Sequence, residues 1–363
     1  MENLERFVCG TKIVSGTGAT EALGELCAKR VLVVTDPFFY ENGMAESVGK
    51  KTGAEAVEIF HRVSPDPGLD LVAAGTAKVR QFQPDLIVAL GGGSAMDCAK
   101  AMRFFSGSIA KFAAIPTTSG SGSEVTDFAI LTHNGVKHPL VDGTLRPDLA
   151  ILDGDYLEKL PRGLIADSGF DVLAHALEAL AASGAGAITD ALARDAFCTA
   201  FSKLGLSYNG DVSVRLEIHK AATMAGMAFT QAGLGLCHAL AHSLGGMFHV
   251  PHGRLNAIVL PAVLDCNAPA VGHKYAELAR RAGLGGSVDT IAVRNLKNGL
   301  VRLRRELELP ETLAQAGVKV PELRQKRDAV VAATLADPCC QTNPVQVDGA
   351  MVRQVLDAVT GHG

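Results

Sequence analysis

Tryptophan is absent from this 363-residue chain, aromatic residues make up only 5% of it, and positive charge is not in surplus, with 34 Lys and Arg against 38 Asp and Glu. A protein whose main partner is a nucleic acid usually has a strongly basic surface, so the net charge of −4 argues against that class. The chain also lacks an apolar run of the roughly 20 residues that cross a membrane. We therefore expect neither a nucleic-acid nor a membrane partner.

Disulfide-forming patterns are lacking as well. The eight cysteines include no CxxC pair, and the adjacent Cys339 and Cys340 are poorly placed to bond to each other. The start of the chain, MENLERFVCGTKIVSG, has no basic segment followed by the apolar segment of a secretory leader. This cysteine usage is typical of a reduced protein, and we predict a cytoplasmic location.

What is present in the first 150 residues is an alternation of β-rich and helical stretches. The sequence predicts strands over 30–36, 56–63 and 84–90 and from residue 111, and helices over 69–82 and 95–105. Such alternation indicates a doubly wound parallel sheet that binds its ligand at the carboxyl ends of the strands. From Pro161 onward only Ala- and Leu-rich helical periodicity is found. We predict an α/β dinucleotide-binding domain over residues 1–158 and an all-helical domain over 159–363.

Histidines are concentrated in the helical part, where CHALAHSLGGMFHVPHG contains His238, His242, His249 and His252. Upstream, DVLAH places an acid and a histidine four residues apart, and this spacing puts both side chains on one helix face. Several imidazoles and a carboxylate suit a divalent metal such as zinc or iron. Any one of these histidines alone could be a core or helix-end residue, whereas the set predicts a metal site.

Two loops of the α/β part are candidates for nucleotide binding. GGGS at 91–94 follows a strand and opens a helix, where backbone N–H groups and the helix dipole favour a pyrophosphate. It lacks the GxGxxG pattern and the P-loop lysine, so an ordinary tight turn is an equal alternative. TTSGSGSEVT at 117–126 is a second loop rich in donors, with a plain solvent loop as the alternative.

Asp36 closes the strand VLVVTD, where an acid can bond the adenosine ribose and repel a 2′-phosphate, which favours NAD over NADP. A turn aspartate without this role is the alternative. Asp97 is either an acid favoured by the helix dipole or a residue that orients the glycine turn.

Four segments, GGGSAMD, AIPTTSGSGSEVT, DVLAHALEA and CHALAHSLGGMFHVPHG, together resemble the iron-containing (group III) alcohol dehydrogenases, in an order that spans nearly the whole chain. The resemblance implies a dehydroquinate synthase-like architecture. The segments LGGGSAMDCAKA, AGMAFTQAGLGLCHALAH and FHVPHG are most similar to the 1-propanol dehydrogenases of propanediol-utilisation microcompartments. Ethanol dehydrogenases and lactaldehyde reductases are near relatives.

The resemblance also implies roles for individual residues. The metal ligands would be Asp171, His175, His238 and His252, and His242 would be a catalytic histidine that relays a proton. The implied cofactor-binding residues are Asp36, Gly92, Gly93, Ser94, Asp97, Thr117, Thr118, Val125 and Lys137. A solvated surface lysine is the alternative for the last of these. His249 matches no functional position, and Asp66 stands where relatives often have Asn.

The implied activity is NAD(H)-linked interconversion of short-chain aldehydes and primary alcohols, such as propanal and 1-propanol or acetaldehyde and ethanol. The metal would be Fe(II), with Zn(II) as the alternative. A lactaldehyde, diol or glycerol dehydrogenase of the same family is the nearest competing hypothesis, and a metal-dependent hydrolase is a remote one. We further expect a homodimer or larger homo-oligomer, an aldehyde dehydrogenase as partner, and a location in the cytoplasm or inside a microcompartment shell.

Overall fold

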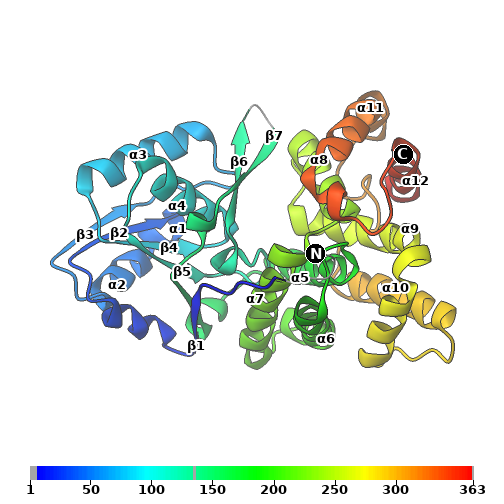
Figure 1. Ribbon diagram of the computed structural model, residues 1–363, viewed down its shortest axis with the longest axis horizontal. Helices are drawn as coiled ribbons and strands as arrows, with labels where there is room; N and C mark the ends of the chain where they lie inside the picture. Colours follow the sequence, from blue (N-terminus) through cyan, green and yellow to red (C-terminus); the bar gives the residue numbers. More distant parts are fainter. Residues whose placement is uncertain (1–5, 134–135, 362–363) are drawn as a thin grey trace. The chain divides into compact units, whose positions relative to one another are not determined.

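The computed structural model describes residues 6–133 and 136–361, which form two compact units (Figure 1). Residues 9–160 make an α/β unit, and residues 161–361 together with residues 6–8 make a helical unit. The fold class predicted from the sequence, a parallel sheet followed by an all-helical part, is confirmed.

All six strands of the main sheet are parallel, in the order β1-β8-β5-β4-β2-β3. Their bounds are β1 Lys12–Gly16, β2 Arg30–Thr35, β3 Ala56–Phe60, β4 Leu86–Gly91, β5 Lys111–Pro116 and β8 Leu149–Asp153. The strands predicted at 30–36, 56–63, 84–90 and from 111 are present. β1 and β8 were not predicted. β1 is a short, largely exposed edge strand with little apolar pattern, and β8 is a single short apolar run, which periodicity alone does not distinguish from a helical segment.

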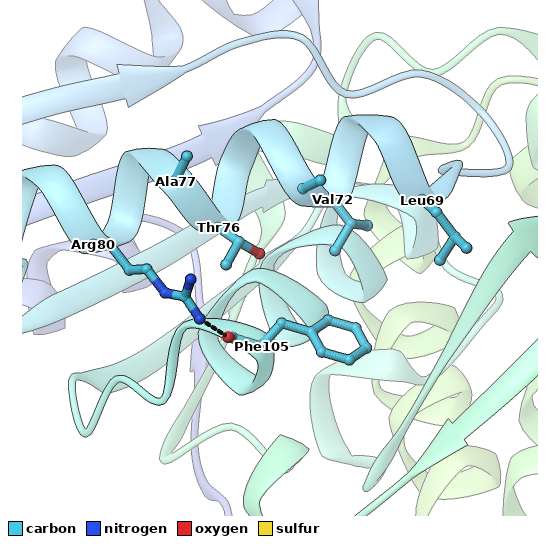
Figure 2. A pocket seen from close by; sticks show the side chains of 7 residues that line it. Leu69, Val72, Thr76, Ala77, Arg80 and Phe105 are labelled. Atoms are coloured by element: carbon cyan, nitrogen blue, oxygen red, sulfur yellow. Dashed lines mark hydrogen bonds between the residues drawn. The ribbon is translucent and has the colours of Figure 1, made fainter.

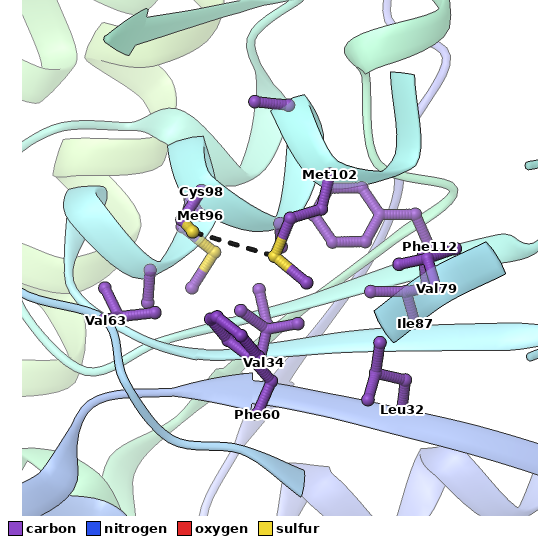
Figure 3. Close-up of a cluster of buried hydrophobic side chains, with 14 of the residues drawn as sticks. Leu32, Val34, Phe60, Val63, Val79, Ile87, Met96, Cys98, Met102 and Phe112 are labelled. Carbon is purple, nitrogen blue, oxygen red and sulfur yellow. Dashed lines mark hydrogen bonds between the residues drawn. The ribbon is translucent and has the colours of Figure 1, made fainter. Parts of the chain in front are cut away.

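Both faces of this sheet are covered, which explains why its strands are continuous apolar runs rather than alternating ones. On β2, Leu32 and Val34 face one apolar cluster, while Val31 and Val33 face the other. The first cluster lies under α3 and α4 (Figure 3). The helices of this unit are α1 Pro37–Glu41, α2 Met44–Lys51, α3 Leu69–Phe82 and α4 Gly93–Ser106, with short 3-10 turns η1 Ala19–Leu26, η2 Ser123–Val125, η3 Gly143–Leu145 and η4 Gly154–Leu157.

An antiparallel hairpin, β6 (Phe128–His133) with β7 (Val136–Val141), forms a second, two-stranded sheet beside α4. The sequence did not predict this hairpin, because the Gly-, Ser- and Thr-rich loop that begins at residue 117 runs into β6 without a clear boundary. The hairpin matters for the site, since β7 carries Lys137 and β6 follows the donor-rich loop directly.

The helical unit contains no strand among its described residues. Its helices are α5 Arg162–Ala181, α6 Ala187–Tyr208, α7 Arg215–Ala232, α8 Leu236–Phe248, α9 His252–Arg281, α10 Asp289–Glu306, α11 Val320–Ala336 and α12 Gly349–Thr360, with the 3-10 turns η5 Val212–Val214 and η6 Pro338–Thr342. α5 is buried almost throughout its second half, so it serves as the central helix on which α6, α7 and α9 pack.

One helix in the described part of the chain, α9, is long and apolar enough by length and composition to cross a membrane, although the sequence analysis expected no such run. In this structure 61% of that apolar window is buried inside the helical unit. The helix also contains Pro261 and Pro269 and bends at Val271, where φ and ψ leave the helical region. α9 therefore packs as a core helix.

Candidate functional site

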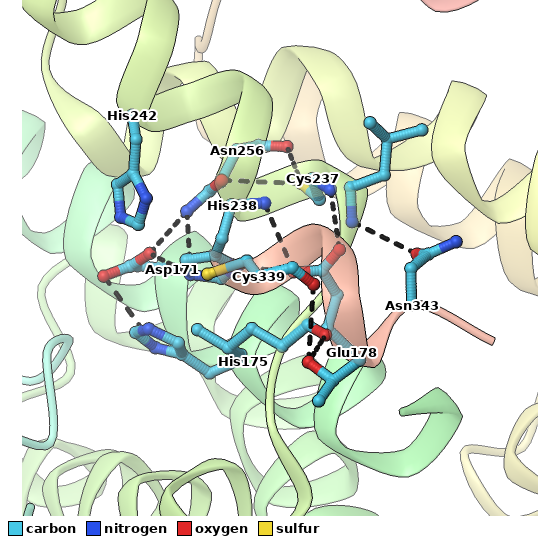
Figure 4. A network of polar contacts seen from close by, with 12 residues as sticks. Asp171, His175, Glu178, Cys237, His238, His242, Asn256, Cys339 and Asn343 are labelled. Carbon is cyan, nitrogen blue, oxygen red and sulfur yellow. Dashed lines mark hydrogen bonds and ion pairs between the residues drawn. The ribbon is translucent and has the colours of Figure 1, made fainter. Parts of the chain in front are cut away.

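Three helices of the helical unit carry the predicted metal ligands, of which Figure 4 shows Asp171, His175 and His238. Asp171 and His175 lie one turn apart on α5, where they are 7% and 5% exposed. His238 lies in the first turn of α8 and His252 opens α9, directly after Pro251 at its N-cap. Because the ligands come from three helices, only the packing of those helices can form the site.

A glycine permits the closest of these helix approaches. A methyl group built on Gly253 would lie 1.9 Å from the backbone oxygen of Asp167, so no larger residue fits where α9 crosses α5. This approach brings Nε2 of His252 to 3.6 Å from Oδ1 of Asp171. A close backbone contact therefore sets the distance between two predicted ligands.

Three ligand atoms converge on one point. Nε2 of His238 and Nε2 of His252 each lie 3.6 Å from Oδ1 of Asp171, and suitable ligand atoms of the three residues all lie within 4.8 Å of one another. The amide nitrogen of Asn256 lies among them, 2.7 Å from Asp171 Oδ1 and 3.3 and 3.2 Å from the two Nε2 atoms. Converging lone pairs of two imidazoles and a carboxylate fit Fe(II) or Zn(II).

His175 borders this group of three. Its Nδ1 lies 3.9 Å from Asp171 Oδ2, whereas the other two histidines pair with Oδ1. Its ring is stacked between Phe229 and His238, with centroid distances of 4.4 Å to each. His175 therefore lies beside Asp171 but does not belong to the group of three residues whose ligand atoms lie within 4.8 Å of one another.

The electrostatics of the group fit a cation site. Burial alone would raise the pKa of Asp171, but His175, His252 and His238 outweigh it and hold that pKa well below its usual range. Burial alone would lower the pKa of His238, but its bonds to Asp171 and Glu178 outweigh burial and raise the pKa to about 9. The buried carboxylate is therefore ionised, and positive charge is favoured at the point where the imidazoles meet it.

Glu178, which the sequence analysis did not single out, holds His238 in place. It is 3% exposed and accepts bonds from the backbone N–H groups of Cys237 and His238, at 2.6 and 3.2 Å. Its Oε2 also accepts from Nδ1 of His238 at 2.7 Å, so Nε2 is the nitrogen of that ring that faces Asp171 and that would offer its lone pair to a metal once the ring has lost its second proton. The spacing was a usable signal, because Glu178 follows Asp171 by two helical turns on the same face of α5.

His242 makes a separate pair with an acid from the far end of the chain. Its Nδ1 donates to Oδ2 of Asp337 at 2.9 Å, and the backbone N–H of Cys339 donates to the other oxygen at 2.9 Å. The ring of His242 is stacked on that of His252, with centroids 5.2 Å apart. No local pattern in the sequence pointed to Asp337. His249, in contrast, ends α8 with a φ of 55°, a helix-end position.

In the α/β unit, the predicted nucleotide residues gather where the strand order reverses. β3 lies on one side of β2 and β4 on the other, so the carboxyl ends of β2 and β4 meet at the switch point of the sheet. Asp36 follows β2 and caps α1, accepting from the N–H of Phe39 at 3.3 Å. Gly91 ends β4 with a φ of 148°, and a methyl group on it would lie 3.7 Å from Oδ2 of Asp36.

The glycine turn and the donor-rich loop are in close contact. A methyl group on Gly92 would lie 3.2 Å from Oγ1 of Thr118, and one on Gly93 would lie 3.1 Å from Oγ of Ser121. The backbone N–H of Thr117 donates to the oxygen of Gly91 at 3.0 Å. The absence of side chains at Gly92 and Gly93 thus lets the second loop lie close to the N-terminus of α4 and leaves the backbone N–H groups there accessible. Ser94 lies in the same turn.

The remaining predicted cofactor residues have protein partners. Asp97 lies just past the first turn of α4, where one carboxylate oxygen accepts from Ser123 Oγ at 2.8 Å and the other from the N–H of Ile130 at 3.0 Å. These bonds connect Asp97 to the second loop and to β6, whereas the role considered for it was to orient the glycine turn, and its part in cofactor binding stays a prediction. Lys137 pairs with Asp66 at 2.8 Å. Val125 is buried, with 5% of its surface exposed.

A recess of about 520 Å³ between α3 and α4 contains none of these residues (Figure 2). It is lined mainly by apolar side chains, and Arg80 at its rim donates to the backbone oxygen of Phe105 at 2.8 Å. Its lack of a converging polar group distinguishes it from the two sites above.

Comparison with known proteins shows the family to which the chain belongs. A model described as iron-containing alcohol dehydrogenase matches residues 10–154, and one described as the C-terminal part of the Fe-containing alcohol dehydrogenase family matches residues 165–360. The chain is also 37% identical to the 1-propanol dehydrogenase PduQ of Citrobacter freundii, over 98% of this chain and 99% of the relative. This chain belongs to the iron-containing alcohol dehydrogenase family.

Other relatives agree with this assignment. The dehydrogenase is 35% identical to the NADPH-dependent butanol dehydrogenase of Clostridium saccharobutylicum, over 98% of this chain and 97% of the relative. An iron-containing alcohol dehydrogenase from Thermococcus thioreducens has a similar structure, with a TM-score of 0.89 and 32% identity over 97% of this chain and 99% of that one. The enzyme is thus an iron-containing alcohol dehydrogenase, as the sequence predicted, and Asp171, His238 and His252 of its helical unit could hold a metal ion.

Proposed function

We propose that this dehydrogenase reduces short unbranched aldehydes with NADH, at a divalent metal held by Asp171, His175, His238 and His252. The observation that carries the proposal is the convergence of Asp171 Oδ1 with the Nε2 atoms of His238 and His252. A bound Fe(II) or Zn(II) acts as a Lewis acid that stabilises negative charge on the substrate oxygen. We assign dinucleotide binding to the predicted domain 1–158 and metal binding and catalysis to the predicted domain 159–363. The compact units of the structure differ slightly from these bounds, since residues 6–8 belong to the helical unit and the α/β unit ends at residue 160.

The protein side of the reaction needs a proton path, and His242 is the residue proposed for it. Because Nδ1 of His242 donates to Asp337, its other ring nitrogen is the one that can take or give a proton. The pair lies one helical turn from His238 on α8. In aldehyde reduction the proton would pass from His242 to the product oxygen while NADH supplies the hydride.

We propose that the dinucleotide binds at the switch point of the sheet, with its pyrophosphate over the Gly92–Gly93–Ser94 turn. Asp36 would accept hydrogen bonds from the adenosine ribose, while Thr117, Thr118 and the segment ending at Val125 would hold the dinucleotide from the other loop. Lys137 would reach the nicotinamide ribose. The support is the contact between the two loops beside Asp36.

Asp36→Gly is expected to allow NADPH to be used. The carboxylate stands where a 2′-phosphate would be placed, and its removal relieves like-charge repulsion. The measurement is kcat/KM with NADH and with NADPH for the wild type and the variant. Asp70→Gly is a control, because this acid is exposed in the first turn of α3 and belongs to neither of the two nucleotide loops. Equal use of both cofactors by the wild type would contradict the role given to Asp36, and the NADPH-dependent relative makes this a real alternative.

Substrate preference is proposed from the relatives and from the apolar surroundings of the metal group. The matches include a 1-propanol dehydrogenase and a butanol dehydrogenase. Around His238, the α8 sequence is mostly Ala, Leu and Gly, and Phe229 covers His175. An apolar pocket discriminates by only about 1–3 kcal/mol per methylene, so selectivity among short aldehydes should be modest.

The test of this proposal is a comparison of kcat/KM for acetaldehyde, propanal, butanal, lactaldehyde and glyceraldehyde, with NADH and anaerobic Fe(II) loading. Comparable values for the first three, above those for the hydroxylated aldehydes, are expected. A clear preference for lactaldehyde or glyceraldehyde would contradict the proposal and favour a diol-oxidising enzyme. A solved 1,3-propanediol oxidoreductase is similar over 98% of this chain, with a TM-score of 0.92 and 29% identity, so this outcome has a structural precedent.

In the cell, we propose that the enzyme regenerates NAD for an aldehyde dehydrogenase. The chain matches 42% of the bifunctional aldehyde-alcohol dehydrogenase AdhE of Escherichia coli, at 36% identity, so one relative combines both activities in a single protein. We also propose that the enzyme is a homodimer or a larger homo-oligomer, located in the cytoplasm or in the lumen of a microcompartment. Co-purification with shell particles, compared with purification from the soluble fraction, distinguishes the two locations.

A further inference from the structure

A lysine is completely buried in the α/β unit. Lys100 on α4 has an exposed fraction of 0%, which is unusual for a charged side chain and requires that its ammonium group be fully bonded. Nζ donates to Ser123 Oγ at 2.9 Å, to Thr126 Oγ1 at 2.9 Å and to the backbone oxygen of Phe128 at 2.8 Å. All three N–H groups of the ammonium are therefore in use.

These bonds connect the glycine-turn helix to the loop that faces it. Ser123 and Thr126 stand at the end of the donor-rich loop, and Phe128 is the first residue of β6. Ser123 Oγ in turn donates to Asp97 Oδ1 at 2.8 Å, one helical turn before Lys100 on α4. The helix that begins at the glycine turn is thus joined to the far end of the loop by Lys100 and Asp97 together.

Stability alone does not account for an ammonium group here. Taking a charge out of water is costly, and an apolar side chain of similar volume often stabilises a core as well or better. Met102, on the same helix, fills the apolar cluster under α4 in this way. The ammonium adds directed hydrogen bonds, because it joins two side-chain oxygens of the loop and one backbone oxygen of β6 to a single point on α4.

We propose that Lys100 is a positioning residue for the dinucleotide, because it holds the loop 117–126 against the glycine turn. The loop side of that contact is Thr118 and Ser121, which lie directly against Gly92 and Gly93. Without the ammonium, Ser123 and Thr126 lose a common donor, and the loop is free to move from the turn. The inference rests on the proposed function, in which these two loops bind NAD(H).

The charge of Lys100 makes the proposed link sensitive to pH. Burial lowers the pKa of Lys100 to about 8, against the opposing influence of Asp97 on α4, Glu124 on η2 and Asp127 before β6, while Arg146 after η3 adds to the lowering. A neutral amine has only two N–H groups for three acceptors. The affinity of the wild type for NADH should therefore weaken as the pH rises through about 8.

The test is an NADH fluorescence titration of metal-loaded enzyme carrying Lys100→Met, which keeps most of the volume and removes the donors. The dissociation constant is expected to rise about tenfold or more, as for a site left with unsatisfied buried acceptors, and its dependence on pH near 8 should disappear. kcat at saturating NADH should change less than KM for NADH. Ser123→Ala keeps the charge of Lys100 but breaks the link to Asp97, so it should also raise the dissociation constant for NADH. This second variant tests the inference if Lys100→Met does not fold.

Met102→Ala is the matched control, since Met102 is equally buried on α4 but contacts the core instead of the loop. It should lower Tm and leave the NADH dissociation constant unchanged. The inference is overturned if the dissociation constant for NADH of folded Lys100→Met or Ser123→Ala lies within about twofold of the wild-type value. It is also overturned if Met102→Ala raises that constant as much as Lys100→Met does. Failure of the wild type itself to bind NADH is a different result, which overturns the proposed function.

Discussion

His238→Ala is expected to lose the bound metal together with nearly all alcohol dehydrogenase activity. His238 is 1% exposed, and its Nε2 lies where it meets Asp171 Oδ1 and His252 Nε2. Alanine removes one nitrogen ligand and leaves the buried Asp171 carboxylate with less positive charge beside it. The metal affinity should fall by more than the roughly 10–100-fold that follows loss of a residue which only orients a ligand. Metal content of anaerobically purified protein and NADH-linked activity are the measurements.

Two further variants sharpen this result. Glu178→Gln removes the negative charge that holds His238 at Nδ1. The variant keeps all four proposed ligands, but its affinity for the metal should fall by about 10–100-fold. His249→Asn is the control, because His249 ends α8 at a positive φ that asparagine tolerates, and it should keep full metal content. Stoichiometric metal in both His175→Ala and His238→Ala would overturn the ligand assignment.

His242→Ala is expected to keep its metal and lose turnover. A residue that transfers protons typically contributes about 10²–10⁴-fold to the rate, so kcat should fall within that range and its pH profile should change. The metal should be retained because His242 pairs with Asp337 and not with Asp171. Turnover should fall because the ring of His242 lies against that of the proposed ligand His252, close to the metal group. Metal content is measured on the same samples as the rate.

Asp337→Asn is the companion variant for this prediction. The amide keeps the size of the side chain but replaces the carboxylate that accepts from Nδ1 of His242 and orients its ring, so kcat should fall as in His242→Ala, but by less. Burial alone would raise the pKa of Asp337, but the bond from His242 outweighs it and lowers that pKa, so the acid is ionised in the wild type. Loss of metal together with activity in His242→Ala would make His242 a ligand and displace His238 or His252 from that role.

Local pattern accounts for much of what the sequence predicted correctly. Strands buried on both faces appear as continuous apolar runs, so Val31–Val34 and Leu86–Leu90 were recognisable without any tertiary information. The i, i+4 pairs on α5 and α8 depend only on helix geometry, and they identified Asp171 with His175 and His238 with His242. The edge strand β1 escaped prediction because it has no fully buried residue. In β6 buried and half-buried residues do alternate, but this strand starts directly after the donor-rich loop, which hid its first residue.

By itself, therefore, the sequence determined the parallel sheet, the helical second half and the residue types of a metal and a nucleotide site. Only the tertiary structure showed which side chains hold those residues in place. Glu178 on His238, Asp337 on His242 and Lys100 on the loop at Ser123 are each contacts between segments that lie 60, 95 and 23 residues apart. Such pairs leave no periodic signal, because the packing of helices and loops, and not spacing along the chain, decides which buried polar groups find each other.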